Sequence, residues 1–340
     1  MKQIILLSLV GMLFLTGLAA AATPRQTATE PRFVRNIIYV NDDNIAGPWT
    51  GSDQYPYRLI QNGIDHAAAH DIILVANGTY YEHLIIPSQL DYLTLGYWNN
   101  PPLETDTLGP QLIGNGTGTG ISICASNVMI TQLEITNYGQ EGRDAGVYVE
   151  TNANGIQISN NIISFSYHGI WIKRDVPRET YHVIDNNIIT NISQRGISIV
   201  LCDSNTIRSN TIINCNWGIY LHDCYKNTVS ENQFSNNTEG LVIDIGIENR
   251  VISNTFTDND YGFGAVGTRS STIQKNNFIG NTISSAYFIT FNRWNADVWT
   301  GNYWGKMVNP LMKPIPGSFV LAKIDLPWLK FDLFPSETPN

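Results

Sequence analysis

Three segments of this chain, TIRSNTIINCNWG (206–218), TVSENQFSNNTEG (228–240) and RVISNTFTDNDYG (250–262), follow one another at intervals of 22 residues. In each segment an apolar residue is followed after three positions by Asn, after two more by a second apolar residue and after six more by Gly. The same columns extend in both directions along the chain. The Asn column is Asn161, Asn187, Asn210, Asn232, Asn254, Asn276 and Asn302, and the Gly column is Gly169, Gly196, Gly218, Gly240 and Gly262. Such a period is typical of a solenoid in which each repeat forms one coil.

The residue types separate two solenoid classes, the leucine-rich repeat and the parallel β-helix. Ile, Val and Phe stand at alternating positions, which favours short strands, and the Leu-x-x-Leu-x-Leu signature is missing. Asn and Gly at fixed offsets suit sharp turns. We therefore predict one all-β domain, a right-handed parallel β-helix with coils of about 22 residues. The stacked Asn side chains are expected to bond to one another along its axis.

The chain outside the repeats predicts the domain limits. Residues 1–22 resemble a secretory signal peptide, with Lys2 before an apolar run, and a retained membrane anchor is the alternative. Residues 23–36 are expected to form a flexible leader, residues 37–305 the β-helix, and residues 306–340 a C-terminal cap and tail. A short helix within residues 56–70 is predicted to cap the first coil. We expect a secreted, cell-surface or periplasmic location, and no other segment is long and apolar enough to span a membrane.

The composition limits the classes of partner that the chain is expected to bind. The chain has 340 residues, a formal net charge of -9 and a pI near 5.1, which argues against nucleic acid or an anionic membrane as a partner. Its 16 Tyr and 8 Trp are more typical of a protein that stacks rings on a ligand. We expect a monomer whose partner is a polysaccharide or another cell-envelope glycan.

Strand alternation predicts which side chains face outward after each column Gly. The second position contributes the aromatic residues Tyr148, Trp171 and Tyr220, and the fourth contributes Glu150, Lys173, His222 and Asp244. Aromatic faces that stack on pyranose rings, beside charged groups that bond to hydroxyls, are typical of a sugar-binding surface. We therefore predict substrate binding by Tyr148, Trp171, Lys173 and Tyr220, with ordinary solvated side chains as the alternative.

Three of these residues are candidates for catalysis, namely Glu150, His222 and Asp244. Glu150 and Asp244 lie four coils apart, about 19 Å at the strand spacing, which is too far for a carboxylate pair acting on one glycosidic bond. His222 and Asp244 are one coil apart, so the carboxylate is expected to orient the imidazole. If the chain is an enzyme, we expect a polysaccharide lyase or a glycoside hydrolase.

Two of the four cysteines occupy equivalent places on neighbouring coils. Cys202 and Cys224 each follow a column Gly by six residues, which predicts Cα atoms about 5 Å apart and a disulfide. The alternatives are free thiols, or a copper or zinc site formed by Cys202, His222 and Cys224. A calcium site at the acidic turn Asp42-Asp43-Asn44 is a further possibility, against an ordinary turn.

Both ends of the solenoid resemble a known family. The segments Ile38-Tyr39-Val40, Gly47-Pro48-Trp49, residues 56–64, residues 77–82 and Gly301-Asn302-Tyr303-Trp304-Gly305 are similar to those of NosD-type β-helix proteins. The resemblance covers residues 37–335 and implies a pectin-lyase-like right-handed parallel β-helix. That group includes polysaccharide lyases, hydrolases, adhesion modules and a periplasmic copper-associated protein, and no catalytic motif of these enzymes matches here. Three functions follow as hypotheses: polysaccharide binding with or without processing, copper handling, and a structural spacer of the cell envelope.

Overall fold

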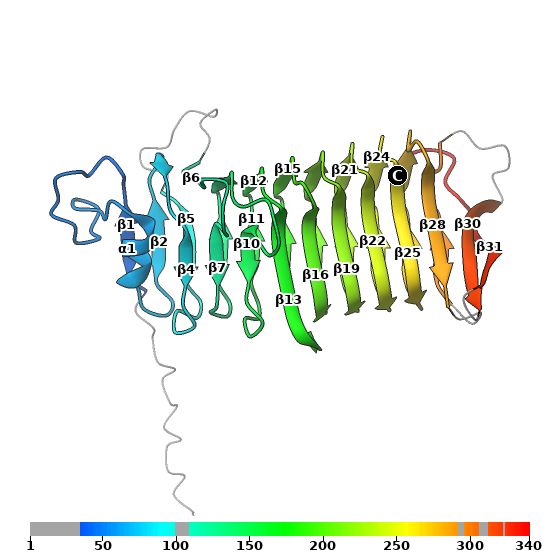
Figure 1. The fold of residues 1–340 in the computed structure, drawn as a ribbon, viewed down its shortest axis with the longest axis horizontal. Helices are drawn as coiled ribbons and strands as arrows, with labels where there is room; N and C mark the ends of the chain where they lie inside the picture. The colour runs from blue at the N-terminus through cyan, green and yellow to red at the C-terminus, as the bar shows by residue number, and fades with distance from the viewer. Residues whose placement is uncertain (1–34, 99–108, 292–295, 306–311, 322–323) are drawn as a thin grey trace, which may run out of the picture. The chain divides into compact units, whose positions relative to one another are not determined.

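The computed structural model describes residues 35–98, 109–291, 296–305, 312–321 and 324–340. The predicted signal peptide and most of the predicted leader lie outside these residues. Within residues 35–340 the chain winds into stacked coils, and Figure 1 shows the strands of successive coils side by side from β2 to β28. Every pairing between coils is parallel, as the repeat predicts.

The coil strands lie in three parallel stacks, each called a sheet below, and a hairpin at the C-terminal end joins the first two stacks into one 22-stranded sheet. The long-strand sheet contains β4 (Leu84–Ile86), β7 (Ile121–Ile123), β10 (Ala145–Val149), β13 (His168–Glu179), β16 (Arg195–Asp203), β19 (Trp217–Tyr225), β22 (Glu239–Ile247), β25 (Tyr261–Arg269) and β28 (Ser284–Thr290). A second sheet contains β1 (Ile37–Val40), β2 (Ile72–Val75), β5 (Thr94–Tyr97), β8 (Met129–Thr131), β11 (Gln157–Ser159), β14 (Val183–Asp185), β17 (Thr206–Arg208), β20 (Thr228–Ser230), β23 (Arg250–Ile252), β26 (Thr272–Gln274) and β29 (Val298–Thr300). The third sheet contains β3 (Thr79–Tyr80), β6 (Gln111–Ile113), β9 (Glu134–Thr136), β12 (Ile162–Ser164), β15 (Ile188–Thr190), β18 (Thr211–Ile213), β21 (Gln233–Ser235), β24 (Thr255–Thr257) and β27 (Asn277–Ile279).

One coil shows how the sequence makes three corners. In the coil formed by β19, β20 and β21, one left-handed residue, Asp223 (φ 50°), lies within β19, and the three that follow the strands are Lys226 (φ 57°), Glu231 (φ 58°) and Asn236 (φ 54°). Each stands directly before a buried Asn, namely Asn227, Asn232 or Asn237. The left-handed conformation therefore belongs to the residue before the ladder Asn, and not to the ladder Asn itself.

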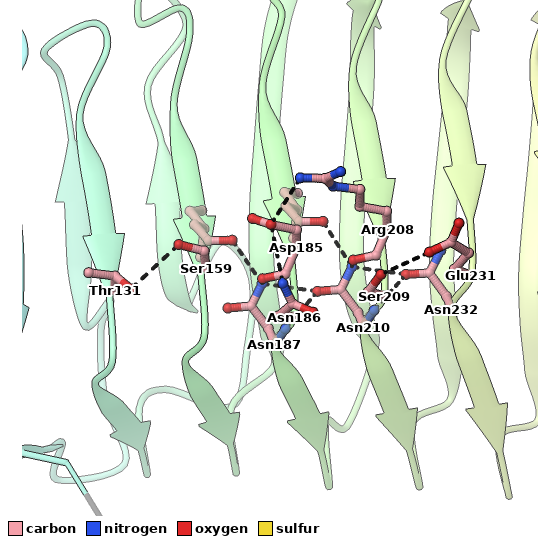
Figure 2. A network of polar contacts seen from close by, with 12 residues as sticks. Thr131, Ser159, Asp185, Asn186, Asn187, Arg208, Ser209, Asn210, Glu231 and Asn232 are labelled. Atoms are coloured by element: carbon pink, nitrogen blue, oxygen red, sulfur yellow. Dashed lines mark hydrogen bonds and ion pairs between the residues drawn. The ribbon is translucent and has the colours of Figure 1, made fainter.

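The buried Asn side chains form ladders along the coil axis. In the predicted column, Asn187 donates to Asn210 Oδ1 at 3.0 Å and Asn210 donates to Asn232 Oδ1 at 2.9 Å, as Figure 2 shows. The same Asn side chains also donate to main-chain carbonyls of the coil before them. This confirms the predicted ladder. Two further ladders, through Asn205, Asn227 and Asn249 and through Asn237, Asn259 and Asn281, were not predicted.

The column glycines make room for the next coil. A Cβ at Gly218 would lie 2.3 Å from the carbonyl oxygen of Gly240 and 3.0 Å from Cδ1 of Phe234, which is in the core. The core between the three sheets contains stacked rings, with 4.7 Å between the centroids of Phe234 and Phe256 and 5.0 Å between those of Phe256 and Phe278. A side chain at the glycine position would therefore push neighbouring coils apart.

The two ends of the solenoid differ. Helix α1 (Ile60–Asp65) lies against the first coils and buries Ile60 and Ile64, which confirms the predicted N-terminal helix with shorter bounds. At the other end, β30 (Met312–Leu321) and β31 (Ile324–Leu333) form an antiparallel hairpin. Among the described residues, none of the helices has the length and apolar character that a membrane crossing requires.

Candidate functional site

The outer side of the long-strand sheet contains a row of residues that we call the aromatic row. Strand register places in it Tyr148, Trp171, Ser198, Tyr220, Val242, Gly264 and Tyr287. The predicted residues Tyr148, Trp171 and Tyr220 thus share one row. The ring centroids of Tyr148 and Trp171 are 5.3 Å apart, whereas Ser198 separates Trp171 from Tyr220. Trp171 is 8% exposed but does not belong to the hydrophobic core, so side chains of the outer surface cover it.

A second row on the same surface, which we call the pre-glycine row, was missed by the sequence reasoning. It contains the residues His168, Arg195, Trp217, Glu239, Tyr261 and Ser284. Its members touch the aromatic row. The ring centroids of Trp217 and Tyr220 are 4.8 Å apart, and the Arg195 guanidinium lies 4.1 Å from the centroid of the Tyr220 ring.

The pre-glycine row faces outward because the strand alternation breaks at the glycine. Gly218 faces the core side chain of Phe234, and the following Ile219 is also fully buried. Two consecutive residues therefore point inward, and the residue before the glycine is turned to the surface. The sequence prediction assigned inward and outward positions only to residues after the glycine, so it could not place the residue before the glycine on the surface. The available signal was that each column Gly follows a large aromatic or ionisable residue.

Tyr220, His222 and Asp244 form one polar cluster. The Tyr220 hydroxyl donates to Asp244 Oδ2 at 2.8 Å, and His222 Nδ1 lies 2.9 Å from the same oxygen. The side chains of His222 and Asp244 are 37% and 29% exposed, so solvent and ligands reach both. The predicted contact between His222 and Asp244 is present, and Tyr220 joins it.

The electrostatics of this cluster define what each group can do. Burial, followed by the hydrogen bond to Asp244, raises the pKa of Tyr220, so its hydroxyl stays protonated as a donor. A proton on His222 Nδ1 donated to Asp244 leaves Nε2 with a lone pair that can accept a proton. The cluster therefore has the parts of a general base with its orienting carboxylate.

Two predicted residues lie away from the cluster. Glu150 follows β10, four strand pairings from β22 and Asp244. The Glu150 carboxylate instead influences Tyr148, whose pKa is raised first by burial and then by the charge of Glu150. Lys173 lies in register with Val200, which in turn lies beside His222, so Lys173 is on the same surface two coils from His222.

A third polar contact was also missed. Tyr287 donates from its hydroxyl to Glu239 Oε2 at 2.8 Å. It reaches this residue by crossing Gly264, where a Cβ would meet the Tyr287 hydroxyl at 2.6 Å. Burial raises the pKa of Glu239, and the hydrogen bond from Tyr287 opposes that shift.

The cysteine prediction is corrected by the structure. All four cysteines are free thiols, so the predicted disulfide between Cys202 and Cys224 is absent. Leu201 (φ 58°) and Asp223 (φ 50°) have left-handed backbone and turn the following cysteine into the core. The Cys224 thiol donates there to the carbonyl oxygens of His222 and Ile199.

The predicted metal ligands are not brought together. Cys202 and Cys224 are buried in the core, whereas the side chain of His222 is on the outer side of the sheet. At the proposed calcium turn, Asp42 accepts a hydrogen bond from the backbone N–H of Thr79 at 2.9 Å. In the part of the chain that the structure describes, no group of three or more His, Cys, Asp or Glu side chains is arranged to hold a metal.

The chain has the fold of several solved structures. The Dettilon tailspike protein gp208 is 14% identical with a TM-score of 0.54, and the match covers 78% of this chain and 61% of that one. Tailspike protein 2 from the Escherichia coli O157:H7 bacteriophage CAB120 is 13% identical with a TM-score of 0.55, and the match covers 72% of this chain and 36% of that one. XylC in complex with xylose is 12% identical with a TM-score of 0.51, and the match covers 88% of this chain and 73% of that one. This chain therefore spans less than two thirds of the two tailspikes.

Sequence comparison agrees with the coil structure. No curated protein matches the chain. Residues 116–283 match the family model described as right handed beta helix region. This segment contains most of the long strands and the whole Tyr220, His222 and Asp244 cluster. The repeats, the parallel strand pairings and this match, which covers just under half of the chain, show the fold of a right-handed parallel β-helix.

Proposed function

We propose that this chain binds a polysaccharide along the outer side of β13, β16, β19 and β22. One observation carries the proposal: Arg195, Trp217 and Tyr220 stack on one another directly beside the polar pair His222 and Asp244. Ring faces stack on the apolar faces of pyranoses, and the polar pair supplies partners for their hydroxyls. The rows repeat once per coil, which suits a ligand that is itself a repeating polymer. The complex of XylC with xylose provides an example of a saccharide bound to a protein of this fold.

Binding is tested by affinity electrophoresis of the full chain in gels that contain a panel of neutral and acidic polysaccharides. Trp217→Ala and Tyr220→Ala are expected to weaken binding about tenfold or more, because each loses a stacking ring. Tyr81→Ala is the matched control, since Tyr81 is 77% exposed and lies outside both rows. If no polysaccharide retards the wild-type chain, or if all three variants lose binding equally, the proposal fails and the structural spacer becomes the better hypothesis.

A second function, acid–base catalysis on the bound polymer, is favoured by the contacts of Asp244 with Tyr220 and His222. We propose a β-elimination in which His222, oriented by Asp244, accepts the proton of the carbon beside a carboxyl group of the ligand; a C=C bond forms, the glycosidic C–O bond breaks, and the leaving oxygen takes a proton from water. His222→Gln and Asp244→Asn are then expected to lower the release of new chain ends by about a hundredfold while binding stays within a few fold. If the wild-type chain binds a polymer and releases no products from it, this second function is rejected and binding remains.

A further inference from the structure

Arg195 is a cation with no ion-pair partner in contact among the described residues, although the Asp244 carboxylate is near enough to act on its charge. Its guanidinium lies over the rings of Tyr220 and Trp217, at 4.1 and 4.8 Å from their centroids. Among the described residues it forms no hydrogen bond and no ion pair. The acidic side chain of the adjacent cluster is already engaged, since Asp244 accepts from Tyr220 and contacts His222. A half-buried cation held by rings alone keeps its hydrogen-bonding capacity for another partner.

The side chains around Arg195 also have unused polar atoms. The buried atoms without a hydrogen-bond partner include His168 Nδ1, Trp171 Nε1, Arg195 Nε and Ser198 Oγ. They are neighbours, because His168 pairs in register with Arg195 and Trp171 pairs with Ser198. Their residues are well covered, with His168 3% exposed and Ser198 fully buried. Buried polar atoms in native structures almost always have partners, so four orphans at adjacent positions point to a ligand group.

The chemistry of these atoms selects the ligand group. The indole and guanidinium nitrogens only donate, and the serine hydroxyl can donate as well. A group that satisfies several donors beside a cation is an anion with several acceptor oxygens. The chain as a whole has a net charge of -9, so general attraction does not draw an anion to this surface and a specific contact is needed.

We propose that the bound polysaccharide is acidic and that its carboxylate or sulfate group is held by Arg195 together with Trp171 and Ser198. This inference rests on the proposed polysaccharide binding and adds the substrate class. In the structure the donors are covered, so the guanidinium moves toward the anion as the ligand binds. That movement breaks no hydrogen bond, because only ring contacts hold Arg195.

The test compares dissociation constants of the full chain for oligosaccharides of polygalacturonate, κ-carrageenan and neutral galactan at low and high salt. The wild-type chain is expected to prefer at least one acidic ligand to galactan by about tenfold. Preference for polygalacturonate assigns a carboxylate, and preference for κ-carrageenan assigns a sulfate. Arg195→Gln is expected to remove the preference, because it weakens binding of the acidic ligand more than binding of galactan, whereas Arg195→Lys retains part of the preference.

Lys173→Gln is the matched control, since it removes the same charge from the same surface without touching the four orphaned atoms. Equal losses in Lys173→Gln and Arg195→Gln would mean general electrostatics and would overturn the assignment. Equal affinity of the wild-type chain for acidic and neutral ligands would also overturn it, while the proposed function would stand. Absence of binding to all three ligands would count against both.

A second measurement avoids variants that fold poorly. The indole N–H resonance of Trp171, assigned by comparison with Trp171→Phe, is expected to move downfield when the acidic oligosaccharide saturates the wild-type chain. An unchanged resonance at saturation would exclude Trp171 from the anion site.

Discussion

The glycine that recurs in the long strands controls the distance between coils. At Gly218 the nearest obstacle to a Cβ is a main-chain oxygen, at 2.3 Å, which cannot move without its whole strand. We predict that Gly218→Ala lowers the free energy of unfolding by about 3 kcal/mol, as overpacking of a rigid site does. Urea denaturation followed by circular dichroism measures the loss.

Gly301→Ala separates this effect from backbone strain. Gly301 has φ 67°, but a Cβ there would meet only Cγ of Lys275 at 3.9 Å. Only the left-handed backbone opposes the new methyl group, and we expect a loss of about 1 kcal/mol. Equal losses at the two glycines would show that close approach is not the reason for the column.

Two buried histidines make stability depend on pH. Burial, followed by the charge of Arg195, lowers the pKa of His168 to about 4, and burial with Arg174 lowers the pKa of His182 to about 3. Below pH 6.5 the unfolded chain takes up protons at both histidines while the folded chain does not. The contribution of these two histidines to stability is therefore greatest above pH 6.5 and falls as the pH drops toward 4.

The variant His182→Gln tests this dependence of stability on pH. In the wild-type chain His182 Nδ1 accepts a hydrogen bond from the backbone N–H of Ile156, and the Gln side-chain oxygen can accept the same bond. We predict that the wild-type chain loses on the order of 3 kcal/mol per histidine between pH 7 and 4. Between the same two pH values, the free energy of unfolding of His182→Gln should fall by less than that of the wild-type chain, and the difference should equal the contribution of one histidine. Urea titrations at pH 7 and pH 4 measure both losses. Parallel losses in both proteins would mean that His182 is charged in the folded state.

At the scale of the element, the ladder Asn is the unit that joins one turn to the next (Figure 2). Asn232 donates to the carbonyls of Ile207 and Ser230 and to Asn254 Oδ1, and it accepts from Asn210. Asn232→Ala leaves buried partners unsatisfied on both neighbouring coils. We predict a loss of about 3 kcal/mol or more in the free energy of unfolding.

The matched variant is Asn281→Ala at the end of another ladder. Asn281 is only half-buried and accepts from Asn259, and within the described residues no further Asn follows it in its ladder. Its replacement should cost clearly less than that of Asn232 in the same thermal or urea assay. A larger loss at Asn281 would contradict a ladder whose strength depends on burial.

The sequence predicts the elements better than the turns between them. Strand register follows from the columns, so the alignment of Trp171 with Tyr148 and of His222 with Asp244 could be predicted from spacing alone. The inward turn of Cys224 could not be predicted from spacing. The left-handed residue that causes such a turn is Asp223 before Cys224 but Leu201 before Cys202 in the preceding coil. No residue type marks that position, and the alternation reverses there without a signal. Arg195 was missed for the related reason that two inward residues follow it.

For the whole molecule, carboxylates close two of the ladders at the C-terminal end. Asp332 accepts from the backbone and side-chain nitrogens of Asn302 and from Trp304 Nε1 at 2.7 Å. Asp297 accepts in the same way from the backbone of Ser271, which follows Asn249 in the second ladder. Each ladder ends on an acceptor-only group, which matches the direction of its donors.

Loss of the Asp332 carboxylate should therefore destabilise the C-terminal coils of the solenoid and leave its central coils stable. We predict that Asp332→Ala raises hydrogen exchange in β29 and the β30–β31 hairpin, while β16 to β18 keep their protection, because each coil contacts mainly its neighbours. Exchange mass spectrometry checks the pattern, with the exposed Glu337→Ala as control. Uniform deprotection across all coils would instead indicate a single cooperative unit.

The hairpin at this end has a consequence for assembly. β30 pairs with β28 of the long-strand sheet, β31 pairs with β29 of the second sheet, and the two hairpin strands pair with each other. Residues 288–290 of β28 and Thr300 of β29, which would otherwise lie on an open strand edge, are thereby paired within one molecule. We therefore expect the hairpin to oppose strand addition by a second copy at this end, as covered strand edges do in other β proteins.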